Sequence, residues 1–307
     1  MMRYLAKRLT AAGIILVGIS VITFCLIFLV PADPISMIAG RNATAETRAQ
    51  IRHQLGLDRP LPVQYGDYVV RLAQGDLGRS YAQKTQVSEL IRARLPATLL
   101  LMAAGIVAEL VIGLPAGIYA ATRRGEAVDR GVMTLSFIGI SAPQFIVGLL
   151  LLYLFAYVVG WFPLSGYGGI SHLVLPAITL GIAGGGTYSR LMRSQMLDVL
   201  RQDYIRTARA KGLPERTVLM THALRNAVLP VIAQVGYDMG FLITNAVIVE
   251  SVFGWPGIGQ LMWQQGIQRL DYPIIMGVTI TAALFIVLGS LIADLIVPLI
   301  DPRIRLR

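Results

Sequence analysis

The stretch LTAAGIILVGISVITFCLIFLV, residues 9–30, contains no charged side chain. A helix of about 20 apolar residues is long enough to cross the roughly 30 Å hydrocarbon core of a bilayer. The rest of the chain has a matching composition: 55% of its residues are hydrophobic, only 14% are charged, and the mean hydropathy is +0.65. Soluble domains carry about 25% charged residues. The sequence therefore predicts an integral membrane protein.

Five further apolar windows follow the first, so we expect an all-α integral membrane protein with six transmembrane helices. The windows are residues 97–121, 132–160, 173–189, 227–249 and 274–299. The window 132–160 is interrupted at Ser141-Ala142-Pro143, and the window 173–189 contains three consecutive glycines. The first window is longer than the 7–15 apolar residues of a secretory signal, which favours a retained helix.

The distribution of Lys and Arg predicts the orientation. Three basic residues precede the first span, eight lie in 190–225 and three close the chain, whereas the short loops of the opposite side carry only Arg269. Positive charges beside spans accumulate on the cytoplasmic side. We therefore expect both termini on the cytoplasmic side. The same bias, facing anionic lipid, explains the net charge of +10 without a nucleic-acid partner.

Three regions follow from this topology: an N-terminal tail with the first span (1–30), an extracytoplasmic loop (31–96) and a membrane core (97–307). The loop contains helix signals. Thr44 can cap a helix that runs to Leu55 with Gly56 as its stop, and a second helix can begin at Pro60 or Pro62 and run through Ala73. The loop mixes basic and acidic residues, which is typical of a small solvated layer.

Signs of catalysis are missing from the sequence. No GxxxxGK[ST] motif is present, so we expect no ATP bound by this chain. His53, His172 and His222 lie in separate loops without a metal-binding pair, and the single Cys25 lies in an apolar span. We therefore expect no catalytic residue, no metal and no cofactor in this chain, which is not an enzyme.

Ionisable side chains inside the spans are costly unless they face protein or water. Glu109, Asp238 and Asp294 are of this kind, and Glu250 sits at a span end. Asp238 belongs to a set spaced i, i+3, i+4, i+7 and i+11, which places its members on one side of a helix: Gln234, Tyr237, Asp238, Phe241 and Asn245. This polar stripe is either a seam against a neighbouring helix or the surface of an aqueous translocation path.

The segment RTARAKGLPERT, residues 206–217, concentrates basic residues in an otherwise apolar chain. Before and within it, Leu197, Leu200, Tyr204 and Ala208 recur at helical spacing and predict one amphipathic helix. Gly212 can end that helix, and Pro214 suits the first turn of the next. The predicted result is a helix, a turn and a helix on the cytoplasmic surface, where lipid headgroups and a protein partner would explain the arginines equally well.

The pattern Thr207-Ala208-x-x-x-Gly212, followed by Leu229-Pro230, resembles the "EAA" loop of ABC importer permeases. Arg206 stands in the glutamate position of that motif, Thr207 in its first alanine position, and the interval to Leu-Pro is longer. Nearly the whole chain is similar to the first permease type of the dipeptide, oligopeptide and nickel importer family, the inner membrane component of binding-protein-dependent transport. The matching blocks are LGLDRPLPVQY (55–65), QGDLGRS (74–80), LPATL (95–99), QDYIRTARAKG (202–212), HALRNAVLP (222–230), ESVFGWPGIG (250–259), LDYP (270–273) and DPRIR (301–305).

The resemblance implies the type I ABC importer permease fold, a place in the bacterial inner, or plasma, membrane and a set of partners. These are a second, homologous permease, two ATPase subunits that hold ATP and Mg²⁺, and an extracytoplasmic substrate-binding protein. The loop 190–226 would couple to the ATPase. The residues implied in that contact are Arg206, Thr207, Ala208, Lys211 and Gly212, and those implied in a re-entrant, plug-like element at the outer mouth are Glu250, Trp255, Pro256 and Gly257.

The cargo expected from the resemblance is a short peptide, dipeptide or oligopeptide. Nickel or another metal chelate, glutathione and opines are alternatives, because closely similar permeases carry them. Two other classes of function stay open from the residues alone. Glu109 and Asp238 would suit a proton-coupled carrier, and a polar stripe that is only a packing seam would suit a membrane scaffold without a path.

Overall fold

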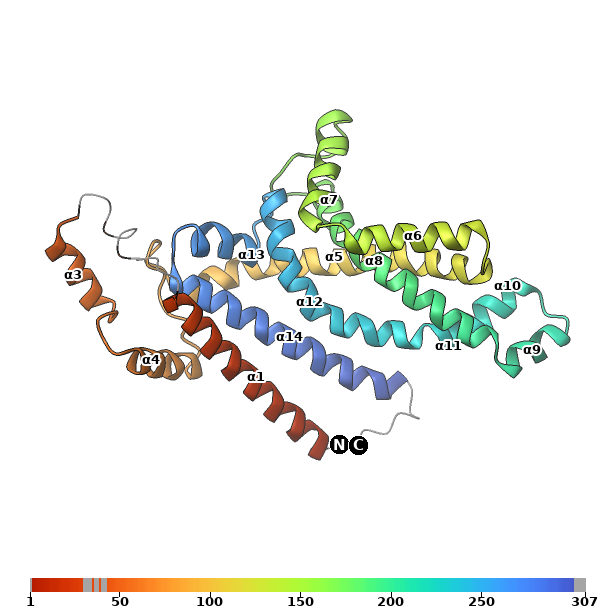
Figure 1. Ribbon diagram of the computed structural model, residues 1–307, viewed down its shortest axis with the longest axis horizontal. Coiled ribbons are helices and arrows are strands. Elements are labelled where there is room, and N and C mark those ends of the chain that lie inside the picture. Colours follow the sequence, from red (N-terminus) through yellow and green to blue (C-terminus); the bar gives the residue numbers. More distant parts are fainter. Residues whose placement is uncertain (1, 30–34, 36–38, 40–42, 301–307) are drawn as a thin grey trace. The chain divides into compact units, whose positions relative to one another are not determined.

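The computed structural model describes residues 2–29, 35, 39 and 43–300. The regular structure in these ranges is helical, apart from one isolated bridge between Arg79 and Gln86. The helices are α1 (Met2–Leu29), α3 (Ala45–Gln54), α4 (Leu61–Ala73), α5 (Val87–Thr122), α6 (Ala127–Ser141), α7 (Gln144–Leu151), η1 (Leu152–Val158), α8 (Ile170–Leu200), α9 (Asp203–Ala210), α10 (Glu215–Thr217), η2 (Val218–Ala223), α11 (Leu224–Ala227), α12 (Leu229–Phe253), α13 (Ile258–Leu261), η3 (Met262–Ile267) and α14 (Tyr272–Ile300) (Figure 1). The prediction of an all-α chain is confirmed.

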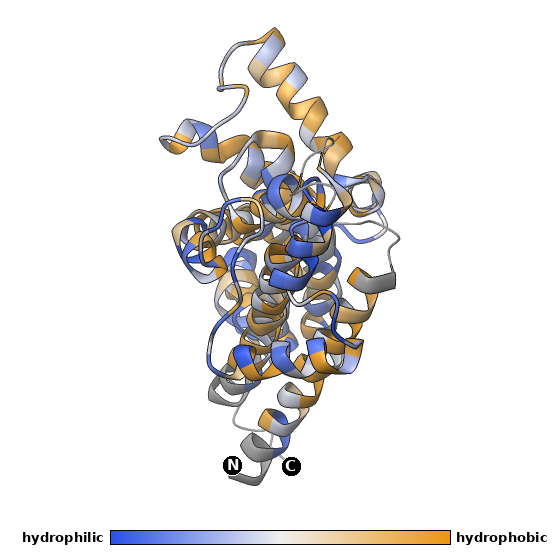
Figure 2. Cartoon of the chain, turned by 90° about the vertical axis from the view of Figure 1, so that its left-hand side faces the viewer, coloured by the Kyte–Doolittle hydropathy of each residue, from blue (hydrophilic) through white to orange (hydrophobic). Residues whose placement is uncertain are grey.

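Five helices, α1, α5, α8, α12 and α14, are long and apolar enough to cross a membrane. Hydrophobic residues recur along the long helices (Figure 2). The predicted span 132–160 differs from a simple crossing, because α6 and the α7–η1 helix are bent by 104°. Ala142 has an extended backbone (φ −73°, ψ 127°), as a residue before proline prefers. The described part of the chain therefore has six candidate spans only if this bent pair is counted as one.

The structure divides into two units, residues 1–98 with 256–285 and residues 99–255 with 286–307. In the first unit the C-terminal end of α1 packs on α4 and the start of α14. The Phe24 ring lies 5.3 Å from that of Tyr65 and 6.3 Å from that of Tyr68, and a hydrogen bond of 3.0 Å joins the hydroxyls of Ser20 and Tyr65. An aromatic cluster thus attaches α4 to the C-terminal end of α1 and to the start of α14.

The two predicted helices of the loop 31–96 are present. Thr44 caps α3 by accepting a hydrogen bond from the Thr47 amide at 3.2 Å, and Gly56 follows it with a φ of +67°. Pro60 is the N-cap of α4. Predictions that fall on residues 30–34, 36–38, 40–42 and 301–307 lie outside the described residues.

Glycines set the packing of α5 against α8 in the second unit. A Cβ atom added at Gly113 of α5 would lie 2.5 Å from Cβ of Tyr188, and one added at Gly181 of α8 would lie 2.6 Å from Cβ of Ala108. At Gly117 an added Cβ would overlap the carbonyl oxygen of Ser189. Small residues let membrane helices approach closely enough for backbone-level contact. The glycine run 184–186 accordingly lies inside one continuous helix, α8, and does not interrupt it.

We expect Gly117→Ala to lower the stability of the protein by about 1–3 kcal/mol, because the added methyl group meets backbone that cannot move. Gly131→Ala on α6 is the matched control, since no atom lies within 4 Å of its added Cβ and alanine favours helix. Melting midpoints of the purified variants in detergent measure both effects. Equal midpoints for the two variants would show that the helix contact tolerates a side chain.

Candidate translocation and coupling sites

A helical hairpin, residues 203–227, follows α8 and is called here the basic hairpin (Figure 1). The expectation of one amphipathic helix from Leu197 through Ala208 is wrong. α8 ends at Leu200, and Gln202 takes an extended conformation (ψ 148°) as the N-cap of α9. Because the helix is interrupted at Gln202, the chain changes direction, and the apolar side of α9 faces α8.

The basic hairpin buries one side. Ile205 and Ala208 of α9, with Val218, Ala223 and Ala227 of the returning helix, join a core that includes Tyr188, Met192 and Met196 of α8. Four of the five predicted coupling residues lie on the exposed side: Arg206, Thr207, Lys211 and Gly212. Ala208 is only 6% exposed, so it positions the hairpin from the inside.

The turn of the hairpin is closed by glycine and by an ion pair. Gly212 has a φ of +75°, as predicted for a left-handed helix stop, and the Arg209 guanidinium binds both carboxylate oxygens of Glu215 at 3.1 and 2.7 Å. This side-chain hydrogen bond to Arg209 lowers the pKa of Glu215. Sequence reasoning missed the pair, although oppositely charged residues on either side of a predicted tight turn were the available signal.

The polar stripe lies on one side of α12 and makes two hydrogen bonds within its unit. The Gln234 amide donates to Asp238 at 3.0 Å, and the Tyr237 hydroxyl donates to Asp294 of α14 at 3.3 Å. Exposure increases at the edge of the stripe, where Tyr237 is 49% and Phe241 68% exposed, whereas Asn245 is partly buried. The stripe is therefore partly a seam to α14 and partly an open surface.

Asp238 has two further polar neighbours from other helices. It interacts electrostatically with Glu109 of α5 and with Tyr188 of α8. Glu109 is 4% exposed, and its carboxyl group occupies the space that a side chain at Gly184 would need. The fold therefore brings together two carboxyl groups that the sequence analysis noted separately. Tyr188 was missed, because its spacing on α8 reads as an ordinary core position.

The segment after α12 forms a tight turn. Gly254 has a φ of +63°, the Glu250 carbonyl accepts a hydrogen bond from the Trp255 amide at 2.9 Å, and the Trp255 ring lies edge-on to Tyr167 at 4.8 Å. Glu250 and Trp255 are both buried. In the other unit, Pro256 is partly buried, and Gly257 precedes α13 as its extended N-cap.

Two buried carboxylates that the sequence analysis did not single out fix connections between helices. Asp129 of α6 accepts two hydrogen bonds from Arg193 of α8 at 2.5 and 2.7 Å. Asp271, just before α14, accepts from the Ser80 hydroxyl at 2.6 Å and from the Ala82 amide at 3.0 Å. Both act through long-range contacts, for which the sequence carried no local signal.

Among the described residues, no group of three or more His, Cys, Asp or Glu side chains is arranged to hold a metal ion. Long apolar helices, intramembrane carboxyl groups and a basic hairpin at the end of α8 define the class as a membrane transport subunit. Residues 113–306 match the family described as binding-protein-dependent transport system inner membrane component, and residues 1–102 match the N-terminal family of the same membrane component. The chain belongs to this family, the multi-pass inner-membrane permeases of ABC importers, in which a separate subunit hydrolyses ATP.

Curated relatives match along almost the whole chain. The oligopeptide transport system permease protein AppB of Bacillus subtilis is 42% identical over 99% of this chain and 100% of its own length. The glutathione transport system permease protein GsiC of Salmonella choleraesuis is 40% identical over 99% of both chains, and a putative peptide permease of Brucella suis is 41% identical over 99% of both. A solved inward-facing MetNI methionine ABC transporter matches with a TM-score of 0.60 and 19% identity, over 69% of this chain and 96% of the other, which supports the fold.

We expect Glu215→Gln to loosen the turn of the basic hairpin at neutral pH, because it removes the ionised partner of Arg209. A pair as exposed as this one contributes about 0.2–1 kcal/mol. Glu215 has a lowered pKa in the folded chain, so its contribution is present above the usual carboxyl pKa and is lost as the pH falls through the lowered value. Hydrogen exchange of residues 203–217 should therefore be faster in the variant at pH 7 and should match the wild type at a pH below the lowered pKa of Glu215. A difference that persists unchanged in acid would contradict the ion-pair explanation.

Proposed function

We propose that this chain forms half of the translocation pathway of an importer for short peptides. Support for a peptide cargo comes from the relatives, which include an oligopeptide permease and a putative peptide permease at 41–42% identity. Glutathione is the principal alternative, because its permease is 40% identical. A metal chelate or an opine is a weaker alternative, since neither is a cargo in the names of these relatives.

The observation that carries the coupling function is that one side of the basic hairpin is buried and the other is exposed. Its inner side packs on Met192 and Met196 of α8, so a push on the hairpin moves a helix of 31 residues as a unit. Its outer side exposes Tyr204, Leu213 and Met220 beside Arg206 and Lys211. Apolar side chains surrounded by cations are suited to docking on a protein groove. We assign this outer side to the ATPase contact.

The partners in this proposal are a second homologous permease, two ATPase subunits that carry ATP and Mg²⁺, the substrate-binding protein and membrane lipid. Both termini are assigned to the cytoplasm. The regions are a tail with the first span (1–30), an extracytoplasmic layer (31–96) and a permease core (97–307) with its coupling loop at 190–226. The positive-inside distribution of Lys and Arg supports this orientation.

The polar stripe of α12 is assigned to the path, and the segment from Glu250 to Gly257 to its outer mouth. Asp238 suits this role because the Gln234 amide donates a hydrogen bond to its carboxyl group within the membrane, which reduces the cost of keeping it there. The exposed rings of Tyr237 and Phe241 leave one edge of the stripe accessible to a second permease or to cargo.

The cargo assignment predicts ATP-dependent uptake of di- or oligopeptides by proteoliposomes that contain this chain, its partner permease, the ATPases and the binding protein. Competition with unlabelled glutathione and with a nickel chelate separates the alternatives. Uptake of glutathione that peptides do not inhibit would overturn the peptide assignment. Uptake by this chain alone, driven by a pH gradient without nucleotide, would instead establish a proton-coupled carrier based on Glu109 and Asp238.

The coupling assignment predicts that Gly212→Leu lowers transport per ATP hydrolysed by roughly tenfold or more. A bulky residue there is strained by about 1–2 kcal/mol and changes the hairpin tip. Gly125→Leu is the matched control, because Gly125 has a φ of +82° and equally open surroundings, and it lies in the α5–α6 turn outside the hairpin. Transport and ATPase rates are measured in the same proteoliposomes. Normal coupling in Gly212→Leu would count against the docking role.

A further inference from the structure

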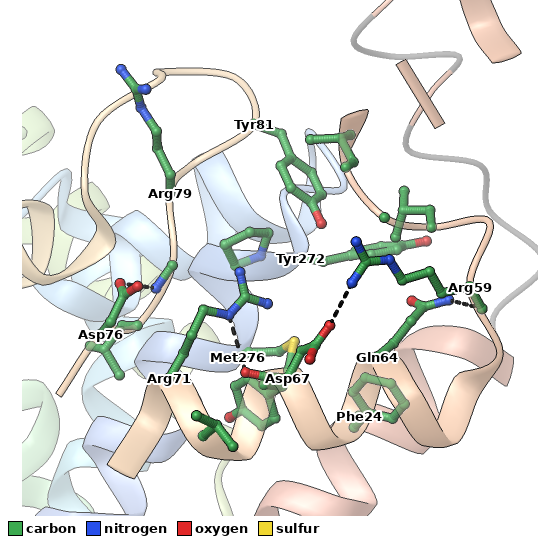
Figure 3. Close-up of a pocket in the computed structure, with 18 of the residues that line it drawn as sticks. Phe24, Arg59, Gln64, Asp67, Arg71, Asp76, Arg79, Tyr81, Tyr272 and Met276 are labelled. Carbon is green, nitrogen blue, oxygen red and sulfur yellow. Dashed lines mark hydrogen bonds and ion pairs between the residues drawn. The ribbon is translucent and has the colours of Figure 1, made fainter. Parts of the chain in front are cut away.

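A cavity of about 560 Å³ lies in the first unit, bounded by α1, the α3–α4 connection, α4, the segment 76–81 and the start of α14 (Figure 3). Its volume is within the range of small-molecule pockets, about 300–1,000 Å³. Phe24 of α1 and Met276 of α14 provide apolar lining, and Tyr81 and Tyr272 add aromatic rings. None of the residues assigned to the path or to the basic hairpin lines it.

The charged groups around the cavity do not all neutralise one another. Arg59 pairs with Asp67 at 3.0 Å, and the Asp76 carboxylate accepts from the Gly78 amide at 2.8 Å. Arg71 donates its Nε to the backbone carbonyl of Asp67 at 3.3 Å, and no carboxylate in the described part of the chain forms an ion pair with its guanidinium. Figure 3 shows the Arg59 and Arg71 guanidinium groups on the two sides of the Asp67 carboxylate, below the Tyr81 ring.

Tyr81 adds a hydrogen-bond donor to this arrangement. Burial, with the nearby charge of Asp271, raises the pKa of its hydroxyl to about 12, while the charge of Arg71 acts in the opposite direction. The hydroxyl therefore keeps its proton at neutral pH. Arg71 is close enough to influence it, so a cation and a neutral donor face the same space. An anion would receive charge-assisted hydrogen bonds from both.

The position of the cavity along the helices places it at the membrane surface. Phe24 lies in the last two turns of α1, which ends at Leu29, and Tyr272 and Met276 lie in the first two turns of α14. Tyrosines gather at this level of membrane proteins, where the headgroups begin. α4 also exposes the aliphatic side chains of Leu61, Val63 and Val70, of which Val70 lines the cavity. Cation, donor and apolar surface together fit a ligand with an anionic head and a hydrocarbon tail.

We propose that this cavity is a binding site for an anionic phospholipid of the outer leaflet. Arg71 and Tyr81 hold the phosphate, Arg59 lies beside it, and the acyl chains cover the exposed aliphatic side chains of α4. The bound lipid joins α4 to the outer ends of α1 and α14. The site does not depend on which cargo the importer carries.

Native mass spectrometry of the full-length chain, released from micelles containing phosphatidylglycerol, tests this site. The wild type should retain one lipid. Arg71→Gln should bind that lipid with roughly tenfold weaker affinity, because it loses one charge-assisted hydrogen bond. Arg71→Lys should retain most of the binding, because it keeps the charge. Arg92→Gln is the matched control, since Arg92 is an exposed arginine of the same unit that does not line the cavity.

Three results would overturn the lipid site. The first is equal retention of phosphatidylglycerol by the wild type and Arg71→Gln. The second is displacement of the lipid by millimolar inorganic phosphate, which would identify a site for free anions. The third is a loss of affinity for the substrate-binding protein in Arg71→Gln with lipid retention unchanged, which would identify a protein-docking surface.

Discussion

The close approach of α5 and α8 is the constraint on which the second unit depends. Gly113 and Gly117 of α5 face Tyr188 and Ser189 of α8 at distances that leave no space for a side chain. In lipid there is no hydrophobic gain from bringing two apolar helices together, so the attraction must come from dense van der Waals contact and polar pairing. The glycines make that contact possible. They also fix which residues of α8 can face α12 and the basic hairpin.

The polar groups of the membrane core follow from this packing. Gly184 leaves room for the Glu109 carboxyl group, and Tyr188, one turn further along α8, lies near both Glu109 and Asp238. Three helices thus contribute to one polar cluster, which surrounding protein shields from lipid. Protein neighbours reduce the cost of an intramembrane carboxyl group, whereas two carboxyl groups this close repel each other when both are ionised. The cluster exists because two glycine-bearing helices approach closely enough for a short acidic side chain to reach between them.

Local features of the fold were predictable from the sequence, because they depend on residues close in the chain. Thr44, Gly56 and Gly212 act as the cap and the stops that their identities predict, and the apolar windows form helices. The break at Gln202 was missed, since the spacing of Leu197, Leu200, Tyr204 and Ala208 continues through it. The spacing of apolar residues shows which side chains are buried. It does not show whether the chain changes direction between them, because α8 and α9 bury their apolar side chains in the same core.

The same distinction applies to the polar sites: contacts within one helix were predictable, and contacts between distant residues were not. The stripe on α12 was predictable, because one helix carries all its members, whereas the pairs Asp129–Arg193 and Ser80–Asp271 join residues 64 and 191 positions apart. The meeting of Glu109 with Asp238 was not predictable either, since it needs the geometry of three helices.

The basic hairpin and the polar cluster are connected by one helix, α8, which would carry the proposed coupling between the hairpin and the path. Tyr188, Met192 and Met196 lie on one side of α8, with Tyr188 near the cluster and all three in the core that holds the hairpin. From Tyr188 to Leu200 the helix is continuous and rises about 18 Å. A bundle with cavities would absorb a small displacement by repacking, but closely packed helices transmit it. Because Gly117 leaves no space for a side chain against α8, the movement of the hairpin that we propose would carry α5 and the Glu109 carboxyl group with it.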